Sequence, residues 1–354
     1  MPQSTAQRAG RPPVMADVAR RAGVSHQTVS RVINGATNIR PETRLRVVEA
    51  IAELGYRPNT AARALVTRRS GTIGVISTEA GHWGPASVQR SVEQAAREAG
   101  WFVSSVNLTP AARRTLPDAV EHLLTQSVEG MIMIAADDEA LELVRAQSPG
   151  VPYVVVEGDL SRAPSAVGVD QDAGARLATR HLLELGHERF LHVAGPPSWT
   201  EAQARRLGWE DELRRSGLPV EEPLPGDWTA ASGFAAGQVV ATRQDVTAVF
   251  AANDQMALGL LRALAEAGVR VPEDVSVVGF DDIPEAAFLL PPLTTVHQDF
   301  AAVGRRAIEV LHAAVTGERE DLPRLVTPTL VVRSSAAPLP SVTRRDGHRT
   351  ASGA

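Results

Sequence analysis

Hydrophobic residues recur at helical spacing in three short segments near the N-terminus. The first segment, VMADVARRAG, ends at Gly23, and the second begins at Ser25, a residue type that favours the N-cap of a helix. The third opens with Pro41, which suits the first turn of a helix, and ends at Gly55. The apolar residues at helical spacing in this third segment are Leu45, Val48, Ile51, Ala52 and Leu54. We therefore predict three short helices packed into a small domain.

After residue 70 the pattern changes to short β-rich runs that alternate with helical stretches. The runs lie at 72–77, 101–106, 130–135 and 153–157, with helical stretches near 86–99, 113–127 and 138–147. The alternation continues with runs at 189–195, 247–253 and 275–282 and helices near 172–185, 201–216, 229–242 and 253–268. Such alternation predicts α/β layers with parallel sheets. Because the segment is large for one sheet, we expect two α/β subdomains with a ligand cleft beyond the carboxyl ends of their strands.

The two ends of the chain are polar and aperiodic, so we interpret residues 1–13 and 338–354 as a disordered arm and tail. No apolar run approaches 18 residues, and the first residues contain no apolar signal core. We therefore expect a cytoplasmic protein without a membrane partner.

Composition excludes several kinds of chemistry. The chain has 354 residues and no cysteine, which rules out disulfides, thiolate metal sites and cysteine nucleophiles. Its nine histidines show no metal-ligand spacing, and no glycine-rich phosphate loop occurs. We expect no cofactor, no metal and no catalytic residue.

Charge is distributed unevenly along the chain. Residues 1–70 contain 12 arginines and four acidic residues, whereas the remaining residues contain 24 basic and 37 acidic side chains. A basic N-terminal segment on an acidic body indicates a module that binds a polyanion, although a solvated basic tail would show the same balance.

The second predicted helix carries side chains suited to reading DNA. It places Ser25, His26, Gln27, Ser30 and Arg31 on one outer face, while valines pack inward. Gln can pair with adenine and Arg with guanine in a major groove. On its own, this helix-turn-helix pattern is also compatible with an ordinary three-helix packing motif.

Longer stretches of the sequence are more specific than the helix-turn-helix pattern alone. The strings DVARRAGVSHQTVSRVING, GYRPNTAARALVTRRSGTIGV, GVDQDAGARLATRHLLELGH, NDQMALGLLRAL, VVGFDD and PPLTTVHQDF occur in this order over residues 14–335. The sequence thereby resembles the lactose/galactose repressor (LacI/GalR) family of bacterial transcription regulators. This resemblance implies a helix-turn-helix DNA-binding domain at 14–58 and a hinge helix or linker at 59–69. It also implies a two-lobed, periplasmic-binding-protein-like α/β domain at 70–337 that binds sugar and forms a dimer.

The resemblance also implies roles for residues in the DNA-binding part. His26, Gln27 and Arg31 match positions that read bases, and Ser25, Thr28, Ser30 and Asn34 match positions that contact phosphates. In the hinge segment, Leu65 matches a residue that wedges into the minor groove of the operator. Asn59 and Ala62 belong to the same segment.

A second set of matched positions converges on a cleft of sugar size. A guanidinium, an amide and a carboxylate suit a ring of hydroxyls, and an indole suits its apolar face. Glu157 stands where sugar-binding members often have an aspartate. The implied effector-binding residues are His82, Trp83, Glu157, Arg205, Trp228, Asn253, Gln255, Asp281, Gln298 and Phe300.

These observations favour a repressor that leaves a palindromic operator when a β-galactoside or β-glucoside binds. The same regulator with a purine corepressor is an alternative, and so is a sugar receptor without DNA binding, although the basic head argues against the receptor. An enzyme that uses Glu157 and Asp281 as a glycosidase pair is a third class, which incubation with glycosides would reveal. The tail lacks leucine heptads, so we expect a homodimer rather than a tetramer.

Overall fold

The computed structural model describes residues 13–33, 35–36, 38–57, 69–109, 115–134, 142, 146, 150–156, 166–318 and 323–339. The chain divides into two compact units, residues 1–70 and 71–354, and each is described by itself. In the described residues, no helix combines the length and the apolar character that crossing a bilayer requires.

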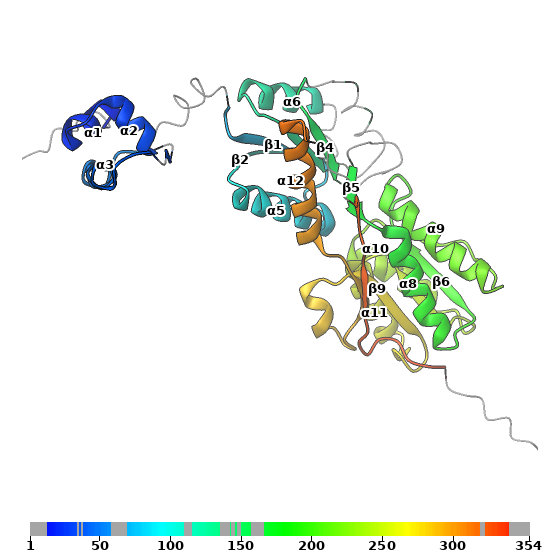
Figure 1. Cartoon of the computed structure of the whole chain (residues 1–354). Helices are drawn as coiled ribbons and strands as arrows, with labels where there is room; N and C mark the ends of the chain where they lie inside the picture. Colours follow the sequence, from blue (N-terminus) through cyan, green and yellow to red (C-terminus); the bar gives the residue numbers. More distant parts are fainter. Residues whose placement is uncertain are drawn as a thin grey trace, which may run out of the picture. The chain divides into compact units, whose positions relative to one another are not determined.

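The described residues of the N-terminal unit form three helices (Figure 1): α1 (Met15–Ala22), α2 (His26–Ile33) and α3 (Pro41–Leu54). Gly23 ends α1 with a φ of 64°, a left-handed conformation that glycine adopts without steric cost. Val18, Val29 and Val47 are fully buried in its small core. The three predicted helices are confirmed.

The buried face of α3 differs from the one that the sequence indicated. Leu45 and Val48 are 59% and 50% exposed, whereas Val47 and Ala50 are buried. The apolar residues of α3 lie on more than one face, so spacing alone could not show which stripe packs against α1.

The second unit contains two six-stranded sheets. The first has the order β11-β5-β4-β3-β1-β2, and all its pairs are parallel. Its strands are β1 (Thr72–Ser77), β2 (Phe102–Asn107), β3 (Met131–Ile134), β4 (Tyr153–Val156), β5 (Ala166–Val169) and β11 (Leu325–Val326). Helices α5 (Trp83–Glu98) and α12 (Phe300–Thr316) share one apolar core with this sheet. Helix α6 (Leu116–Thr125) shares a second apolar core with other side chains of β1 and β3. These elements form the first lobe.

The second sheet has the order β12-β10-β9-β8-β6-β7, parallel except for the pairing of β12 with β10. Its strands are β6 (Phe190–Ala194), β7 (Leu224–Pro225), β8 (Ala248–Ala251), β9 (Ser276–Asp281), β10 (Thr294–His297) and β12 (Thr329–Val331). The helices α8 (Gln171–Glu184) and α9 (Thr200–Arg215) form one apolar core with it, and α10 (Ala230–Ala241) and α11 (Asp254–Glu266) form another. With the 3₁₀ helix η2 (Pro284–Phe288), these elements form the second lobe. The predicted two-lobed α/β architecture is confirmed.

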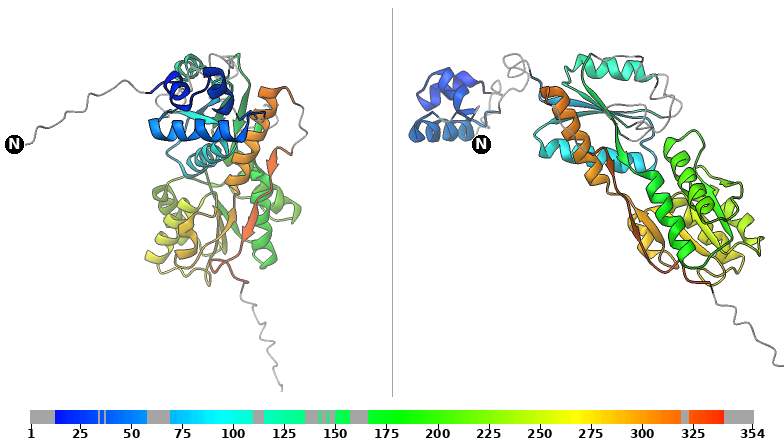
Figure 2. Two further views of the ribbon diagram at one scale, coloured as in Figure 1. Left: turned by 60° about the vertical axis from the view of Figure 1, so that its left-hand side comes forward. Right: turned by 45° about the vertical axis from the view of Figure 1, so that its right-hand side comes forward.

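The chain passes between the lobes at three crossings, which follow β5, β10 and β11. The second crossing brings α12 beside α5, more than 200 residues earlier in the sequence, as the orange and cyan helices show in Figures 1 and 2. Our strand and helix predictions did not include α12. Its signals were Asp299, which caps the helix by accepting from the Ala302 amide, and Gly317 at its end.

Candidate functional site

The outer face of α2 presents the side chains that the sequence assigned to DNA. Ser25 caps the helix, since its Oγ accepts the Thr28 amide hydrogen at 3.1 Å. Val29 and Val32 are buried beneath, whereas His26, Gln27 and Arg31 are exposed and Thr28 and Ser30 are half-buried. The helix therefore exposes His26, Gln27 and Arg31, side chains of the kind that reads base edges.

Arg31 is also oriented from outside its own helix, because its Nη2 donates to the side-chain oxygen of Asn38. Four predicted DNA contacts, Asn34, Asn59, Ala62 and Leu65, lie outside the described residues. Their roles stay predictions.

In the second unit, a pocket lies where several parallel strands end. Trp83 follows β1, Trp199 follows β6, Asn253 follows β8, and Asp281 is the last residue of β9. Carboxyl ends of parallel strands are the usual ligand sites of such folds. The pocket takes residues from both lobes and is lined by His82, Trp83, Gly84, Pro85, Trp199, Glu201, Arg205, Trp228, Asn253 and Asp281.

Arg205 is the centre of this pocket, and its charge is buried. Its Nε donates to Oε1 of Gln171 at 2.8 Å, and its Nη1 donates to the Ala252 carbonyl and lies 3.6 Å from Oδ1 of Asp281. Its guanidinium also faces the ring of Phe280, with 3.9 Å between its carbon and the ring centroid. A buried guanidinium with these partners is fixed in position in the lining of the pocket.

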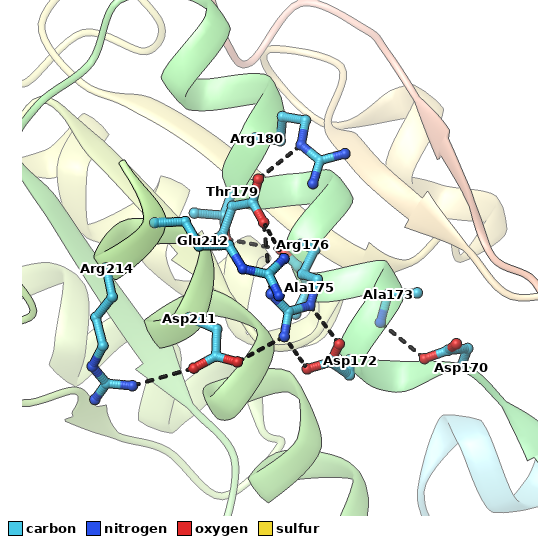
Figure 3. Close-up of polar contacts among 11 residues, drawn as sticks. Asp170, Asp172, Ala173, Ala175, Arg176, Thr179, Arg180, Asp211, Glu212 and Arg214 are labelled. Carbon is cyan, nitrogen blue, oxygen red and sulfur yellow. Dashed lines mark hydrogen bonds and ion pairs between the residues drawn. The ribbon is translucent and has the colours of Figure 1, made fainter. Parts of the chain in front are cut away.

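Arg205 is placed by the tight packing of α9 on α8. A Cβ added to Gly208 would come within 2.5 Å of the Asp172 carbonyl oxygen, so only glycine permits this approach. Arg176 of α8 then reaches Asp172 at 2.5 Å and Asp211 of α9 at 2.8 Å, as Figure 3 shows. The two helices are thereby locked in register, one turn from Arg205.

Trp228 covers one side of the pocket in a strained conformation. Its φ is 72°, which costs a non-glycine residue on the order of 1–3 kcal/mol. Its carbonyl accepts from Nδ2 of Asn253 at 3.1 Å, and its ring lies so close to Gly195 that a Cβ there would be 2.2 Å from it. Asn253 in turn caps α11 by accepting the Met256 amide at 2.9 Å. The strain persists because neighbouring groups fix this indole.

Asp281 also combines strain with burial. Its φ is 112°, and burial raises the pKa of its carboxyl group to about 6, although Arg205 and the amide of Gln298 lower it. The neighbouring Asp254 accepts from the Thr295 hydroxyl at 2.6 Å and from the Ile283 amide at 2.9 Å, which fixes the turn after Asp281. Burial, followed by the charge of Asp281, raises the pKa of Asp254 well above its usual range.

Aromatic rings supply the apolar walls. Trp199 meets Trp228 edge-on with centroids 5.5 Å apart, and His82 meets Trp199 edge-on at 5.2 Å. Among the described residues, the indole N–H groups of Trp83 and Trp228 are buried and have no hydrogen-bond partner. Two unused donors in a polar pocket suit a ligand that brings its own acceptors.

The pocket is small. Its volume of about 30 Å³ accommodates one or two water molecules rather than a sugar. Trp83 of the first lobe packs against the core of the second lobe, so a ligand of sugar size can enter only if these side chains, or the lobes, move apart.

Both units of the chain match known protein families. Residues 14–59 match the model described as bacterial regulatory proteins, lacI family, and residues 179–336 match a periplasmic binding protein-like domain. The chain is 35% identical to the lactose operon repressor of Escherichia coli, over 92% of this chain and 91% of the repressor. The chain belongs to the lacI family of bacterial regulatory proteins.

Two other relatives and two solved structures extend this result. The regulator CelR of Thermobifida fusca is 39% identical over 92% of this chain and 98% of its own, and the repressor PurR of Haemophilus influenzae is 33% identical over 90% and 97%. The lac repressor dimer bound to operator and the anti-inducer ONPF superimposes with a TM-score of 0.82 at 35% identity, over 92% of this chain and all of that one. A CelR–cellobiose complex superimposes with a TM-score of 0.68 at 34% identity, over 92% of this chain and all of that one. The relatives are named as repressors and regulators.

Within this lacI-family member, the predicted effector residues separate into four groups. His82, Trp83, Arg205, Trp228, Asn253 and Asp281 line the one pocket. Gln255 lies behind Asn253, whose Nδ2 donates to it at 3.0 Å. Gln298 and Phe300 instead line a separate hollow of about 640 Å³ beside α5, and Glu157 lies outside the described residues.

The sequence analysis did not assign Trp199, Glu201 or Gln171. Trp199 and Glu201 line the pocket, and Gln171 accepts from Arg205. A signal for Trp199 existed, since an aromatic residue in the loop after a β-strand stands at the usual ligand edge of the fold. Gln171 had no such signal, because its contact joins residues on different helices.

The buried carboxyl of Asp281 predicts a pH dependence of stability. Its folded pKa of about 6 exceeds the ordinary value of 3.8, so the folded state binds more protons between these values, and stability falls as pH rises from 4 to 6. Asp281→Asn removes this slope. The free energy of unfolding of the variant, relative to that of the wild type, should therefore rise by on the order of 3 kcal/mol from pH 4 to pH 6. Urea unfolding can be followed by tryptophan fluorescence, since all five tryptophans lie in the second unit.

Asp274→Asn is the matched control for this measurement. Asp274 is paired with Arg270 at the surface, where hydrogen bonds from Arg270 lower its pKa to about 2, so its replacement should give no slope above pH 5. A flat difference between Asp281→Asn and the wild type from pH 4 to 6 would show that the buried carboxyl titrates normally.

Proposed function

We propose that the chain is a transcriptional repressor that binds a palindromic operator through α2 and leaves it when a neutral β-glucoside or β-galactoside binds the pocket. The observation that supports this ligand class best is the set of buried groups around Arg205. Arg205, Asn253 and Asp281 bring a guanidinium, an amide and a carboxylate to the lining of one small pocket, and these are the groups that suit vicinal hydroxyls.

The tryptophans support a pyranoside in the same way. Sugar rings present an apolar face that stacks on an indole, and Trp228 and Trp83 have N–H groups free to donate to ring hydroxyls or a glycosidic oxygen. The CelR relative was solved with cellobiose, a β-linked glucose disaccharide. The buried Asp281 carboxylate would repel a phosphate or carboxylate group, so we favour a neutral sugar.

A purine corepressor is the second candidate, because PurR is similar over almost the same length. A flat purine also stacks on an indole. The hydroxyl-matched set of Arg205, Asn253 and Asp281 favours the sugar, and the binding experiment below includes a purine.

A two-fold operator requires a two-fold protein, and an apolar surface is available for self-association. Phe288 and Leu290 are 83% and 89% exposed in and just after η2, an unusual exposure for large apolar side chains. The related lac repressor was solved as a dimer on its operator. We infer a homodimer and propose that this surface contributes to its interface.

The base-reading role of α2 predicts a selective loss in Arg31→Ala. We expect the variant to lose about 1–3 kcal/mol of binding free energy on a duplex selected by the wild-type protein from a random pool. Binding to a scrambled duplex of the same composition should change little, because Arg31 acts on base edges.

Arg21→Ala is the matched control, since it also removes an exposed guanidinium, one that pairs with Glu53 of α3 at 2.6 Å. It should leave the ratio of selected to scrambled affinity unchanged. Equal weakening of both duplexes by Arg31→Ala would refute base reading by this residue.

The pocket assignment predicts that Arg205→Ala abolishes sugar binding but not operator binding. Calorimetry with cellobiose and lactose should give micromolar-range affinity for at least one of them with the wild type, and none with Arg205→Ala. Because the ionised Asp281 is the better acceptor, the affinity should fall about tenfold from pH 7 to pH 5.

Arg215→Ala removes an exposed arginine from the end of the same helix and should bind sugar normally. The same calorimetric titrations are made with glucose 6-phosphate and hypoxanthine. If only these two compounds bind, or if Arg205→Ala retains the sugar response, the proposed pocket is wrong.

A further inference from the structure

Two buried glutamines lie at the crossings between the lobes. Gln171 begins α8, two residues after β5, and Gln298 directly follows β10. They are 8% and 3% exposed, and Nε2 of Gln171 donates to Oε1 of Gln298 at 2.9 Å. One hydrogen bond thus joins two crossings that are 127 residues apart in the sequence.

The outer ends of this pair bind the two charged residues of the pocket. Arg205 donates from Nε to Oε1 of Gln171 at 2.8 Å, and Nε2 of Gln298 donates to Oδ1 of Asp281 at 2.6 Å. The contact of 3.6 Å between Arg205 and Asp281 closes a ring of four side chains. We call these residues, Arg205, Gln171, Gln298 and Asp281, the hinge ring.

The direction of every hydrogen bond in the hinge ring is fixed by its charged members. A guanidinium can only donate, and an ionised carboxylate can only accept. Gln171 must therefore turn its oxygen to Arg205 and its nitrogen to Gln298, and Gln298 must turn its nitrogen to Asp281. Neither amide can flip without placing two donors or two acceptors face to face, so a change at Arg205 or Asp281 affects the bond between the crossings.

The two glutamines belong to two different sets of tightly packed helices. Gln171 lies on α8, which is locked to α9 and Arg205 by the Gly208 approach and by the ion pair between Arg176 and Asp211 (Figure 3). Gln298 leads into α12 of the first lobe, where a Cβ on Gly304 would come within 2.5 Å of the Ser91 backbone in α5. Because α5 begins with Trp83, this second body carries the opposite wall of the pocket.

We infer that Gln171 and Gln298 are positioning residues that couple ligand contacts at Arg205 and Asp281 to the geometry of the two crossings. This inference rests on the proposed function. A sugar must enlarge the pocket of about 30 Å³, and its hydroxyls compete for the groups that hold the hinge ring closed. The bond between Gln171 and Gln298 then weakens, and the lobes change their relative angle.

Hydrogen exchange on the full-length protein without ligand tests the bridge itself. In Gln171→Met, which keeps the side-chain length but removes both hydrogen bonds, amides of residues 297–303 should exchange about tenfold faster, although the substitution lies at the other crossing. Gln203→Met, an exposed glutamine of α9, is the matched control and should change neither crossing. An increase confined to residues 166–175 would overturn the inference.

The coupling is tested with Gln171→Glu, whose carboxylate still accepts from Arg205 but cannot donate to Gln298. Cellobiose should bind this variant within about threefold of the wild type, whereas saturating cellobiose should shift its operator affinity less than twofold, against about tenfold in the wild type. A wild-type shift in Gln171→Glu would overturn the inference. So would complete loss of cellobiose binding in Gln298→Met, which would make Gln298 a direct sugar contact.

The two experiments separate this inference from the proposed function. If neither cellobiose nor lactose binds the wild type, the proposed ligand class fails, while the exchange rates of residues 297–303 still decide whether the bridge exists. If a sugar binds but Gln171→Met leaves those exchange rates unchanged, the pocket assignment is supported and the coupling role of the hinge ring is refuted.

Discussion

The burial of one guanidinium organises the effector unit. A charge removed from water must be compensated by hydrogen bonds and counter-charges, and Arg205 has the Gln171 oxygen, the Ala252 carbonyl, the Asp281 carboxylate and the face of Phe280. These partners come from α8, from the end of β8 and from β9, so satisfying Arg205 fixes the position of α9 relative to all three. The close contact of Gly208 in α9 with the Asp172 carbonyl in α8 lies one helical turn from Arg205.

Strain is concentrated around the same charge. Trp228 and Asp281 both have positive φ angles, and both line the pocket. Neither conformation would persist on its own, but Asn253 fixes Trp228, and the ring through Gln298 fixes Asp281. A ligand that exchanges hydrogen bonds with Arg205 or Asp281 therefore acts on groups that the fold holds away from their relaxed geometry. In the proposed mechanism, ligand entry, backbone strain and lobe geometry are parts of one equilibrium.

The sequence predicted the elements better than their contacts. The α2 helix was predictable because Ser25, Gly23 and the inward valines are local signals, and the strands because short apolar runs alternate with helices. The buried stripe of α3 was not, since its apolar residues do not form a single stripe and only packing against α1 selects Val47 and Ala50 over Leu45 and Val48. Six effector residues could be brought together by resemblance. Gln171 could not, because its role depends on contacts that span 34 and 127 residues.

The most direct test is a crystal structure of the chain with cellobiose. We expect a sugar whose hydroxyls contact the Arg205 guanidinium and the Asp281 carboxylate, with Trp83 and Trp228 on its faces, in a pocket larger than about 30 Å³ and with the lobes further apart. The rival location is the hollow of about 640 Å³ lined by Arg90, Phe300 and Arg305. A sugar in that hollow, with Arg205 still bonded to Gln171 and the pocket still small, would contradict the account.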